Sequence, residues 1–379
     1  MRIKGFLKDI TGFFNVMKER KKTIEEAKET FDDVDRVLIN QKRIHPGIIT
    51  TQVLDIKKEG SSSARIRFAL TKDIILFSGT YLSIKLVIDG HYVSRPYSII
   101  TSPKEAQENG YVEIIVKEKE AGFVSKYLTR ALKKGDIVRI DVNQGDFSYN
   151  ALRDKKDVLF IAGGVGVTPF ISLSKDLLER KAVNSITLIY GVRNTTDILA
   201  KEELDELEKQ GVKVIYVMSE EPSYKGEKGF VSKDIIKKYV DIHNVTFFIC
   251  GPIVMVDYVK KELKDLDIDL RKVRYEGYIE PHLAEEKEYN LTIKRGLETT
   301  TIKAKANESL LVAIEKSGIK HDSSCRSGRC GYCHIKVIKG EYHLLDDSYI
   351  RYADKELGYV HSCITYPKSD LLIQIPIED

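Results

Sequence analysis

The stretch SSCRSGRCGYCHI, from Ser323 to Ile335, carries three of the five cysteines in a chain of 379 residues. Cys325, Cys330 and Cys333 follow the spacing C-x4-C-x2-C, and the later stretch GYVHSCITYP supplies a fourth cysteine, Cys363. Clustered cysteines in a reducing compartment bind metal or act in redox chemistry. The sequence therefore predicts that these four residues act together.

Two kinds of metal centre use four thiolates, and the spacing favours one of them. Zinc sites usually pair two C-x2-C hairpins, whereas only one is present here. The observed spacing is that of plant-type ferredoxins, in which four thiolates hold two irons bridged by two sulfides. Gly328 and Gly331 would supply the backbone freedom that such a tight loop needs. We therefore expect a 2Fe-2S cluster, with zinc as the alternative.

The residues before this loop predict the fold around it. The stretch YNLTIKRGLETTTIKAKANESLLVAIEKSGI reads as two alternating strands followed by a helix that is capped near Asn307 or Ser309. This order resembles the opening of a ferredoxin's β-grasp fold. We expect residues 282–379 to form one α+β ferredoxin-type domain.

Composition limits the other interpretations. The chain has 61 basic and 57 acidic residues and a net charge of +4, so no general attraction to nucleic acid or membranes is expected. The N-terminus scatters charges among its apolar positions and does not read as a signal peptide. The longest apolar stretches are too short to cross a bilayer. We expect a cytoplasmic protein without disulfides, nucleic-acid partner or transmembrane segment.

The stretch VLFIAGGVGVTPFISLSKDLL predicts a site for a diphosphate. A buried strand at 158–161 leads into a turn with Gly163, Gly164 and Gly166, and a helix starts after Pro169. Such a turn points backbone N–H groups and a helix dipole at phosphate. Apolar strands in ITLIYGVRN, VKVIYVMSEEP and VTFFICGPIVMVDYV alternate with helices near 200–209 and 232–240. Residues 151–281 are therefore predicted to form a doubly wound parallel α/β sheet.

Short strands separated by turns precede that domain. They are predicted at 47–57, 64–71, 80–88, 95–100, 111–117 and 137–142, a spacing typical of an antiparallel β-barrel over residues 45–150. In the stretch RPYSI, Arg95 and Tyr97 face the same way on one strand, next to Ser98. An arginine can pair with phosphate, an aromatic ring can lie on a flavin and a hydroxyl can reach its redox-active nitrogen. Packing of the aromatic residue is the alternative.

These motifs, in this order, resemble the ferredoxin–NADP reductase superfamily. The resemblance implies that the GGxGxTP turn binds the nicotinamide diphosphate, that CGP lies beside the nicotinamide ring, and that AGFVSKYLTRAL forms a second flavin element. A second element favours FAD over FMN. The implied cofactor-binding residues are Arg95, Pro96, Tyr97, Ser98, Gly122, Val124, Ser125, Gly163, Gly164, Gly166, Thr168, Pro169, Cys250, Gly251 and Pro252.

The resemblance also implies which residues lie at the reacting rings. We assign catalytic positions to Tyr97, Ser98, Cys250 and Glu276, the last from the element E-x-F/Y in VRYEGYI. Tyr278 of that element either covers the flavin or anchors the linker. The chain departs from the family in the loop that closes the barrel, where Gln144 replaces a frequent proline before the glycine.

Electron counting then predicts the function. NADH gives up two electrons together and a 2Fe-2S cluster accepts one at a time, so a flavin must stand between them. We expect a reductase that passes electrons from NADH through FAD and the cluster to an external metalloprotein, such as an oxygenase or a hybrid-cluster protein. The alternative is an electron-transfer subunit bound permanently to a larger dehydrogenase.

Glu220, after the strand VKVIYVM, favours NADH over NADPH because a carboxylate repels the 2′-phosphate. The histidines near the cluster, His321, His334 and His361, are expected to support the cluster loop or lie at the surface.

Residues 1–44 lie outside the resemblance and are predicted to form helices. Apolar residues recur at helical spacing at Ile3, Phe6, Leu7, Ile10, Phe14 and Met17. This stripe either docks a partner or an anionic membrane, or packs on the chain's own barrel. The stretch TIEEAKETFDDVDRVL is expected to continue as a second, acidic helix.

Overall fold

The computed structural model describes residues 6–26, 35–60, 62–120, 122–278, 287–345 and 349–376. Two compact units are present, Met1–Lys42 and Arg43–Asp379. The apolar position Ile3 and the predicted linker after Tyr278 lie outside the described residues. Within the described ranges, no helix combines the length and apolar character needed to cross a bilayer.

The N-terminal unit contains the helix α1 (Phe6–Glu25) and most of α2 (Arg36–Ile44). The stretch TIEEAKETFDDVDRVL was predicted to form a second, acidic helix, but its first residues, from Thr23 to Glu25, belong to α1. Residues 27–34 of this stretch lie outside the described residues, and α2 starts at Arg36. The side chain of Asp35 explains this start, since it accepts hydrogen bonds from the backbone N–H groups of Val37 and Leu38 at 3.0 and 2.9 Å. Phe14 and Met17 of the apolar stripe are exposed, and the role of the stripe stays a prediction.

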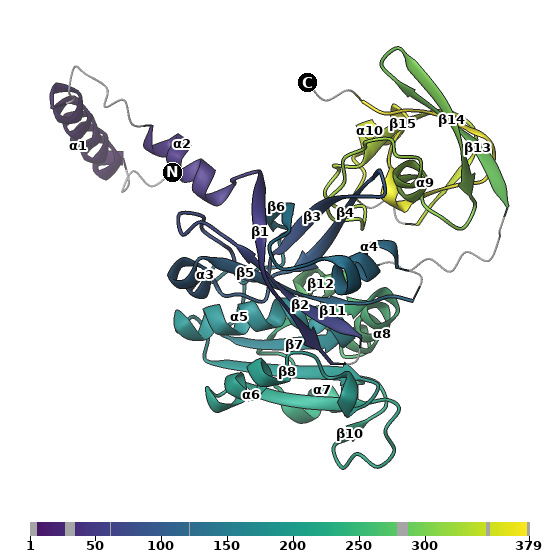
Figure 1. Cartoon of the computed structure of the whole chain (residues 1–379). Coiled ribbons are helices and arrows are strands. Elements are labelled where there is room, and N and C mark those ends of the chain that lie inside the picture. The colour runs from purple at the N-terminus through teal and green to yellow at the C-terminus, as the bar shows by residue number, and fades with distance from the viewer. Residues whose placement is uncertain are drawn as a thin grey trace. The chain divides into compact units, whose positions relative to one another are not determined.

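The second unit begins with an antiparallel β-barrel (Figure 1). Its strand order is β4-β3-β6-β1-β2-β5, and an isolated bridge between Ile99 and Ile114 joins the two outer strands. Alternating residues of these strands fill one apolar core. The elements are β1 (Ile48–Glu59), β2 (Ser63–Ala69), β3 (Tyr81–Ile88), β4 (His91–Ser98), α3 (Pro103–Asn109), β5 (Tyr111–Lys117), α4 (Phe123–Lys126), a π-helical turn (Tyr127–Ala131) and β6 (Ile137–Gln144).

Strand β4 starts earlier than the predicted 95–100. It pairs with β3 from His91 onward, through a tight turn at Asp89 and Gly90. Both turn residues have positive φ, 50° and 80°. A two-residue hairpin turn of this kind requires such angles, and Asp-Gly is a sequence that adopts them readily. The hairpin holds Arg95 and Tyr97, two of the predicted flavin residues, in register with β3.

A parallel α/β domain follows, as predicted. Its sheet has the order β10-β9-β8-β7-β11-β12 with all neighbours parallel, and an apolar core lies on each face. The elements are β7 (Asp157–Gly163), a 3-10 turn (Gly164–Val167), α5 (Thr168–Glu179), β8 (Ser185–Val192), α6 (Lys201–Lys209), β9 (Lys213–Met218), β10 (Glu227–Lys228), α7 (Lys233–Tyr239), β11 (Thr246–Pro252), α8 (Ile253–Lys264) and β12 (Arg274–Tyr278).

Buried contacts join the barrel to this sheet. Phe147, just after β6, packs its ring 5.4 Å from that of Phe248 and lies in the core of the α/β domain. The backbone N–H of Gly79 donates to Ser172 Oγ at 3.0 Å. Arg65 of β2 donates from Nη2 to Glu203 of α6 at 2.8 Å. The two domains therefore share one packed junction.

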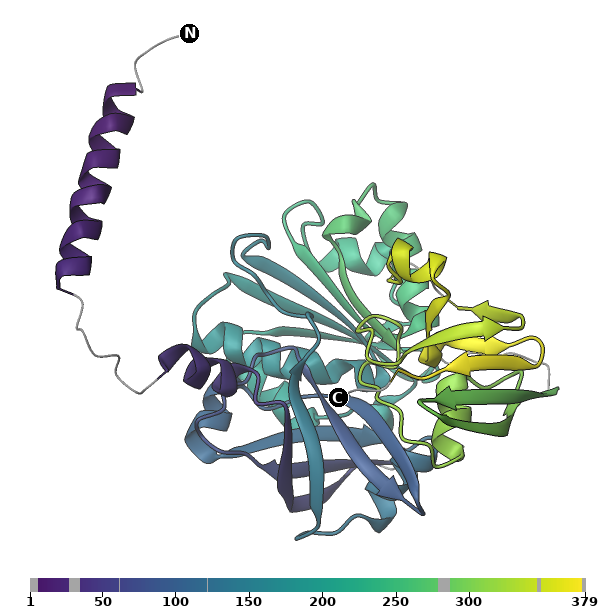
Figure 2. The ribbon, with the colours of Figure 1, turned by 90° about the horizontal axis from the view of Figure 1, so that it is seen from above.

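The C-terminal domain is α+β, as predicted, and Figures 1 and 2 show it beside β3 and β4. Its main sheet has the order β14-β13-β19-β15-β17, and Ser309 caps the helix α9 by accepting from Val312 N at 3.4 Å. The elements are β13 (Glu288–Arg295), β14 (Glu298–Lys305), α9 (Leu310–Lys316), β15 (His334–Lys339), β16 (Tyr342–Leu344), α10 (Tyr352–Glu356), β17 (Tyr359–His361), β18 (Thr365–Pro367) and β19 (Leu371–Gln374).

Candidate functional site

The glycine-rich turn packs directly on the CGP segment. Gly163 ends β7, and Gly164 continues with φ of +53° into the 3-10 turn. A Cβ atom on Gly166 would overlap the carbonyl group of Cys250 and come within 2.8 Å of Gly251 Cα. Only glycine permits this approach. The structure thus brings both predicted nicotinamide motifs together at the carboxyl ends of β7 and β11, where ligands bind in such sheets.

Helix α5 begins at Thr168, immediately after the turn. Thr168 Oγ1 donates to Val165 O at 2.8 Å, and Pro169 occupies the first helical turn. Tyr190 of β8 holds the turn from the side, because its hydroxyl donates to Gly164 O at 2.9 Å and accepts from Leu199 N at 3.3 Å. No side chain that the structure describes caps the start of this twelve-residue helix, so the positive end of its dipole can face a diphosphate. These features fit a nicotinamide nucleotide.

The CGP segment also faces the predicted residue Glu276. Cys250 and Glu276 are paired residues on β11 and β12. Gly145, with φ of +88°, lies close to both Tyr81 and Glu276. A Cβ atom at Gly145 would come within 2.8 Å of the Tyr81 ring and 3.5 Å of Glu276 Oε1. The loop after Gln144 therefore brings the carboxyl group next to the barrel. Burial, and secondarily Glu276, raises the pKa of the Cys250 thiol, which stays protonated.

Glu276 should make stability depend on pH. Burial raises its pKa from 4.5 to about 7, against the effect of Arg329. A carboxyl whose pKa is raised by folding favours the folded state below its unfolded pKa and loses that contribution as pH rises toward 7. We expect Glu276→Gln to melt at nearly the wild-type temperature at pH 5 and at a higher one at pH 8, with a gain of up to roughly 3 kcal/mol.

Thermal melting of both proteins at the two pH values measures this difference. Glu262→Gln serves as the matched control, because Glu262 is a carboxylate of the same domain that accepts from Lys233 N near the surface. An equal difference between Glu276→Gln and wild type at pH 5 and pH 8 would contradict the assigned pKa.

The predicted flavin residues of the barrel lie along β4. Tyr97 is partly buried against the barrel core, and its pKa is raised by burial while Arg95 and Arg326 oppose the rise. Pro96 and Ser98 lie opposite Ser83 and Tyr81 in the β3–β4 pairing. Arg95 donates from Nη1 to Glu315 in the C-terminal domain at 3.0 and 3.1 Å. The arginine predicted to bind phosphate thus also contacts the ferredoxin-type domain.

The second flavin element forms the start of α4. Gly122 is its N-cap residue, and the Val124 side chain is buried in the barrel core. The Ser125 hydroxyl accepts a hydrogen bond from Lys119 N at 3.1 Å. Val124 can therefore meet a cofactor only through its backbone, while Gly122 and Ser125 lie at the helix start as predicted.

The four cysteines form two pairs. Cys325 and Cys330 interact with each other, as do Cys333 and Cys363. Among the described residues, no three His, Cys, Asp or Glu side chains converge on a single metal position. Two pairs of thiolates fit a centre with two irons, each held by one pair, better than one tetrahedral zinc.

Backbone donors in the loop are directed at sulfur. The N–H groups of Ser327 and Cys330 donate to Cys325 Sγ at 3.4 and 3.3 Å. The Cys330 thiol makes the largest contribution to a lowered pKa of Cys325, and backbone amides such as that of Ser327 add to it. Burial acts in the opposite direction. Gly328 and Gly331 both have φ of +76°, as predicted for the tight loop. Such donors stabilise thiolates that hold an iron–sulfur cluster.

The three histidines near the cysteines support the loop. His361 Nδ1 lies 2.6 Å from Gly328 O, and His334 Nδ1 lies 3.1 Å from Gly331 O. His321 Nε2 lies 3.0 Å from Ser362 Oγ, and burial lowers its pKa to about 4. Each of these histidines therefore has a hydrogen-bond partner within the loop or beside it.

The cysteine loop contacts both preceding domains. The hydroxyls of Ser324 and Tyr81 lie 3.5 Å apart at the barrel. Arg329 donates to Tyr275 O at 3.0 Å on β12 of the α/β domain, and its guanidinium lies 4.8 Å from the Tyr275 ring. The cluster loop therefore lies where the flavin barrel and the nicotinamide domain meet.

Sequence reasoning missed several of these residues. Tyr81 and Tyr190 resemble ordinary strand aromatics, and nothing in their neighbourhood marks them. Arg326 and Arg329 carried a usable signal, because both stand between the first two cysteines of the loop. Basic residues at those positions could have been predicted to contact neighbouring domains.

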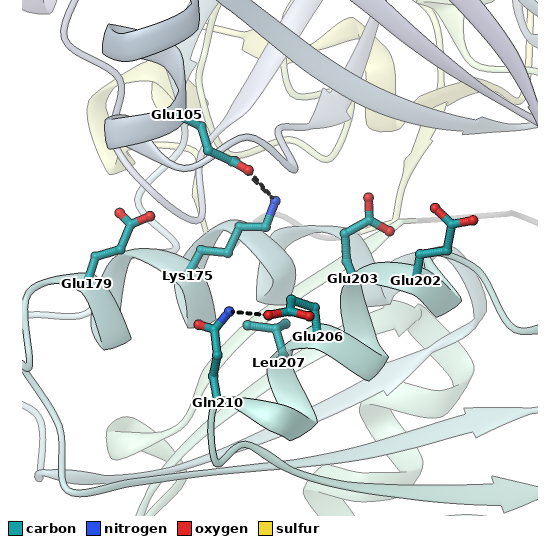
Figure 3. Close-up of a pocket in the computed structure, with 8 residues that line it drawn as sticks. All are labelled: Glu105, Lys175, Glu179, Glu202, Glu203, Glu206, Leu207 and Gln210. Atoms are coloured by element: carbon teal, nitrogen blue, oxygen red, sulfur yellow. Dashed lines mark hydrogen bonds and ion pairs between the residues drawn. The ribbon is translucent and has the colours of Figure 1, made fainter.

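A pocket of about 380 Å³ lies away from these motifs, between the barrel and helices α5 and α6 (Figure 3). Its wall includes the carboxylates Glu105, Glu179, Glu202, Glu203 and Glu206. Lys175 is bound to Glu105 at 2.8 Å. The remaining negative charge opposes phosphate binding, so we do not assign a nucleotide to this pocket.

Comparison with known proteins identifies the family. Residues 50–149 match the oxidoreductase FAD-binding domain, 160–261 the oxidoreductase NAD-binding domain, and 294–368 the 2Fe-2S iron-sulfur cluster binding domain. NADH-cytochrome b5 reductase 1 of Aspergillus oryzae is 34% identical over 243 residues, which cover 60% of this chain and 82% of that protein. The chain belongs to the ferredoxin–NADP reductase superfamily.

This superfamily member contains a 2Fe-2S domain after its NAD-binding domain and is an oxidoreductase. The glycine betaine monooxygenase reductase subunit of Chromohalobacter salexigens is 26% identical over 322 residues, covering 78% of this chain and 86% of that one. The structure of phthalate dioxygenase reductase has a TM-score of 0.66 at 20% identity and covers 88% of this chain and 98% of that one. That likeness confirms the predicted fold of barrel, parallel sheet and ferredoxin domain.

Proposed function

We propose that this superfamily member uses NADH to reduce an external one-electron acceptor protein. The observation that supports this most is the position of the cluster loop, which contacts Tyr81 of the flavin barrel and Tyr275 of the nicotinamide domain. FAD, when bound, converts the two-electron supply of a nicotinamide into single electrons. A metalloprotein such as an oxygenase component is the proposed acceptor, in line with the monooxygenase reductase relative.

The residues provide binding and positioning. Thr168 and the turn at Gly164 would hold the diphosphate of NADH, and Cys250 would place the ring beside Glu276. Tyr97 and Ser98 would hold the flavin ring, and the four cysteines the cluster. A cytoplasmic location is proposed because the clustered cysteines of the sequence suit metal binding in a compartment that keeps thiols reduced.

Anaerobic mixing of the purified protein with NADH tests the proposal. We expect the flavin absorption to be lost first and the cluster absorption second. When cytochrome c is then added as an acceptor, it should be reduced at a steady rate. Turnover that appears only after co-purification with a large subunit would instead support a permanently bound electron-transfer subunit.

Nucleotide choice is proposed to depend on Glu220. This exposed residue follows β9, and its backbone N–H donates to Arg193 O at 2.7 Å. A carboxylate there can bond a free ribose hydroxyl and repels a 2′-phosphate. We expect wild type to prefer NADH and Glu220→Arg to reduce the ratio of kcat/KM for NADH over NADPH by about tenfold or more, roughly 1.4 kcal/mol.

Steady-state kinetics with both nucleotides measures the ratio. Glu221→Arg is the matched control, because that neighbouring carboxylate is already engaged by Thr195 N at 2.7 Å. A wild-type preference for NADPH would contradict the assignment of Glu220.

A further inference from the structure

Glu315 is a buried carboxylate at the boundary between the ferredoxin domain and the barrel. It lies on α9 and is 4% exposed. Its two oxygens accept from Arg95 Nη1 at 3.0 and 3.1 Å, and Oε1 also accepts from Arg326 Nη1 at 2.6 Å. One carboxylate thus joins an arginine of the flavin strand to the arginine that follows the first cluster cysteine.

Neighbouring polar contacts extend the same junction. Ser94 Oγ donates to Ser323 O at 3.0 Å, and Arg326 Nη1 lies 3.4 Å from Ser94 O. The His91 ring lies 3.2 Å from the backbone oxygen of Glu315. All of these bonds link β4 to α9 or to the start of the cysteine loop. The alignment of the loop against β4 therefore depends on a small set of buried bonds.

Charge explains why Glu315 is central to this set. Burial lowers the pKa of Arg95, Arg326 lowers it further, and Glu315 opposes both. Without the carboxylate, two guanidiniums would lie close together in a buried place with no anion between them. Such an arrangement is strongly unfavourable and is relieved by moving the groups apart. The two arginines belong to different domains, so the domains would separate at this point.

Arg95 retains donors for a second partner. Within the described part of the chain, every hydrogen bond of its guanidinium leaves from Nη1. An arginine has five N–H donors, so those on Nε and Nη2 remain for a phosphate. With two guanidiniums and one carboxylate, the junction carries one excess positive charge next to Tyr97. Arg95 can therefore serve the flavin and Glu315 at the same time.

We propose that Glu315 is a positioning residue for electron transfer between flavin and cluster, because it bridges Arg95 and Arg326 and so holds the cluster loop against the flavin strand. The proposal rests on the proposed function. The step concerned is the passage of single electrons to the cluster after NADH has supplied two. In this role Glu315 acts through Arg95 and Arg326, whose guanidiniums its carboxylate binds.

Stopped-flow reduction of Glu315→Gln by NADH tests this role. Flavin reduction should change less than about twofold, whereas cluster reduction should slow by roughly tenfold, because the rate of transfer between two held groups falls as the cluster loop moves away from the flavin strand. Hydrogen–deuterium exchange should rise in segments 91–98 and 323–329, which reports on docking independently of turnover.

Glu308→Gln is the matched control. Glu308 lies just before the N-cap of α9 and pairs with Lys316 of that helix, and its bonds stay inside the ferredoxin domain. It should leave both reduction phases and the exchange pattern unchanged. If the Glu315→Gln protein lost its cluster, the Glu315→Asp variant would be measured in its place. Glu315→Asp keeps the negative charge on a shorter side chain, so its rate of cluster reduction should lie between those of wild type and Glu315→Gln.

Two results are distinguishable. If the wild-type cluster is not reduced by NADH at all, the proposed function fails. If wild type reduces its cluster and Glu315→Gln or Glu315→Asp does so at the same rate, the positioning role is overturned while the proposed function stands. Raised exchange with an unchanged transfer rate would also overturn it.

Discussion

Cys330→Ala is expected to abolish the visible absorption of the 2Fe-2S cluster while FAD stays bound. The cysteines belong to a domain whose apolar cores are separate from that of the barrel, so loss of the cluster leaves the flavin site folded. Flavin reduction by NADH and turnover of ferricyanide should persist. Reduction of cytochrome c or of the native acceptor should fall by about 10²-fold or more. The four cysteines act as one unit, so removal of one of them should remove nearly all electron transfer through the cluster.

Absorption spectra, iron content and the two acceptor assays measure these effects. Cys250→Ala is the matched control for the spectrum, because Cys250 is the one cysteine outside the four and should leave the cluster in place. If Cys330→Ala reduced the native acceptor at the wild-type rate, the cluster would not lie on the electron path, and the ferredoxin domain would have another role.

Tyr97→Ala is expected to have the opposite phenotype, with the cluster retained and FAD lost. The Tyr97 ring packs on the barrel core, and its removal takes away the surface on which a flavin would lie and opens a cavity beside it. We expect FAD binding to weaken by about 10²-fold, roughly 2.7 kcal/mol. Fluorescence titration of flavin-depleted protein gives the dissociation constant directly.

Tyr97→Phe keeps the ring and serves as the control. It should bind FAD with nearly the wild-type constant, which separates stacking from any role of the hydroxyl. Unchanged FAD affinity in Tyr97→Ala, with normal reduction by NADH, would mean that this residue packs the barrel and does not hold the flavin.

The sequence was sufficient wherever a function depends on residues close together in the chain. The spacing of Cys325, Cys330 and Cys333 predicted the cluster loop, and the glycine turn before Thr168 predicted a strand, a turn and a helix. In each case, local backbone chemistry determines the structure: only glycine allows the close approach at Gly166, and the positive φ of Gly328 and Gly331 lets the cysteine loop turn tightly. Three domains and their order followed from these motifs.

The contacts between domains could not be predicted in the same way. Glu315 is separated from Arg95 by most of the chain, and no periodic pattern marks either residue as a partner of the other. Their pairing depends on how α9 packs against β4, which is set by tertiary packing and not by local propensity. The early start of β4 was also missed, although Asp89 and Gly90 are a typical hairpin signal.

Arg65, which joins the barrel to the α/β domain, has a consequence for behaviour on heating. Besides Glu203, it pairs with Glu59 at 3.2 Å and lies 3.9 Å from Glu113, and all four side chains are largely buried. The hydration of charged groups becomes less favourable as temperature rises, so the cost of keeping such a network out of water falls, while stabilisation by apolar burial levels off. The junction therefore gains strength relative to its surroundings in warm conditions. We expect the barrel and the nucleotide domain to denature together, as one cooperative block.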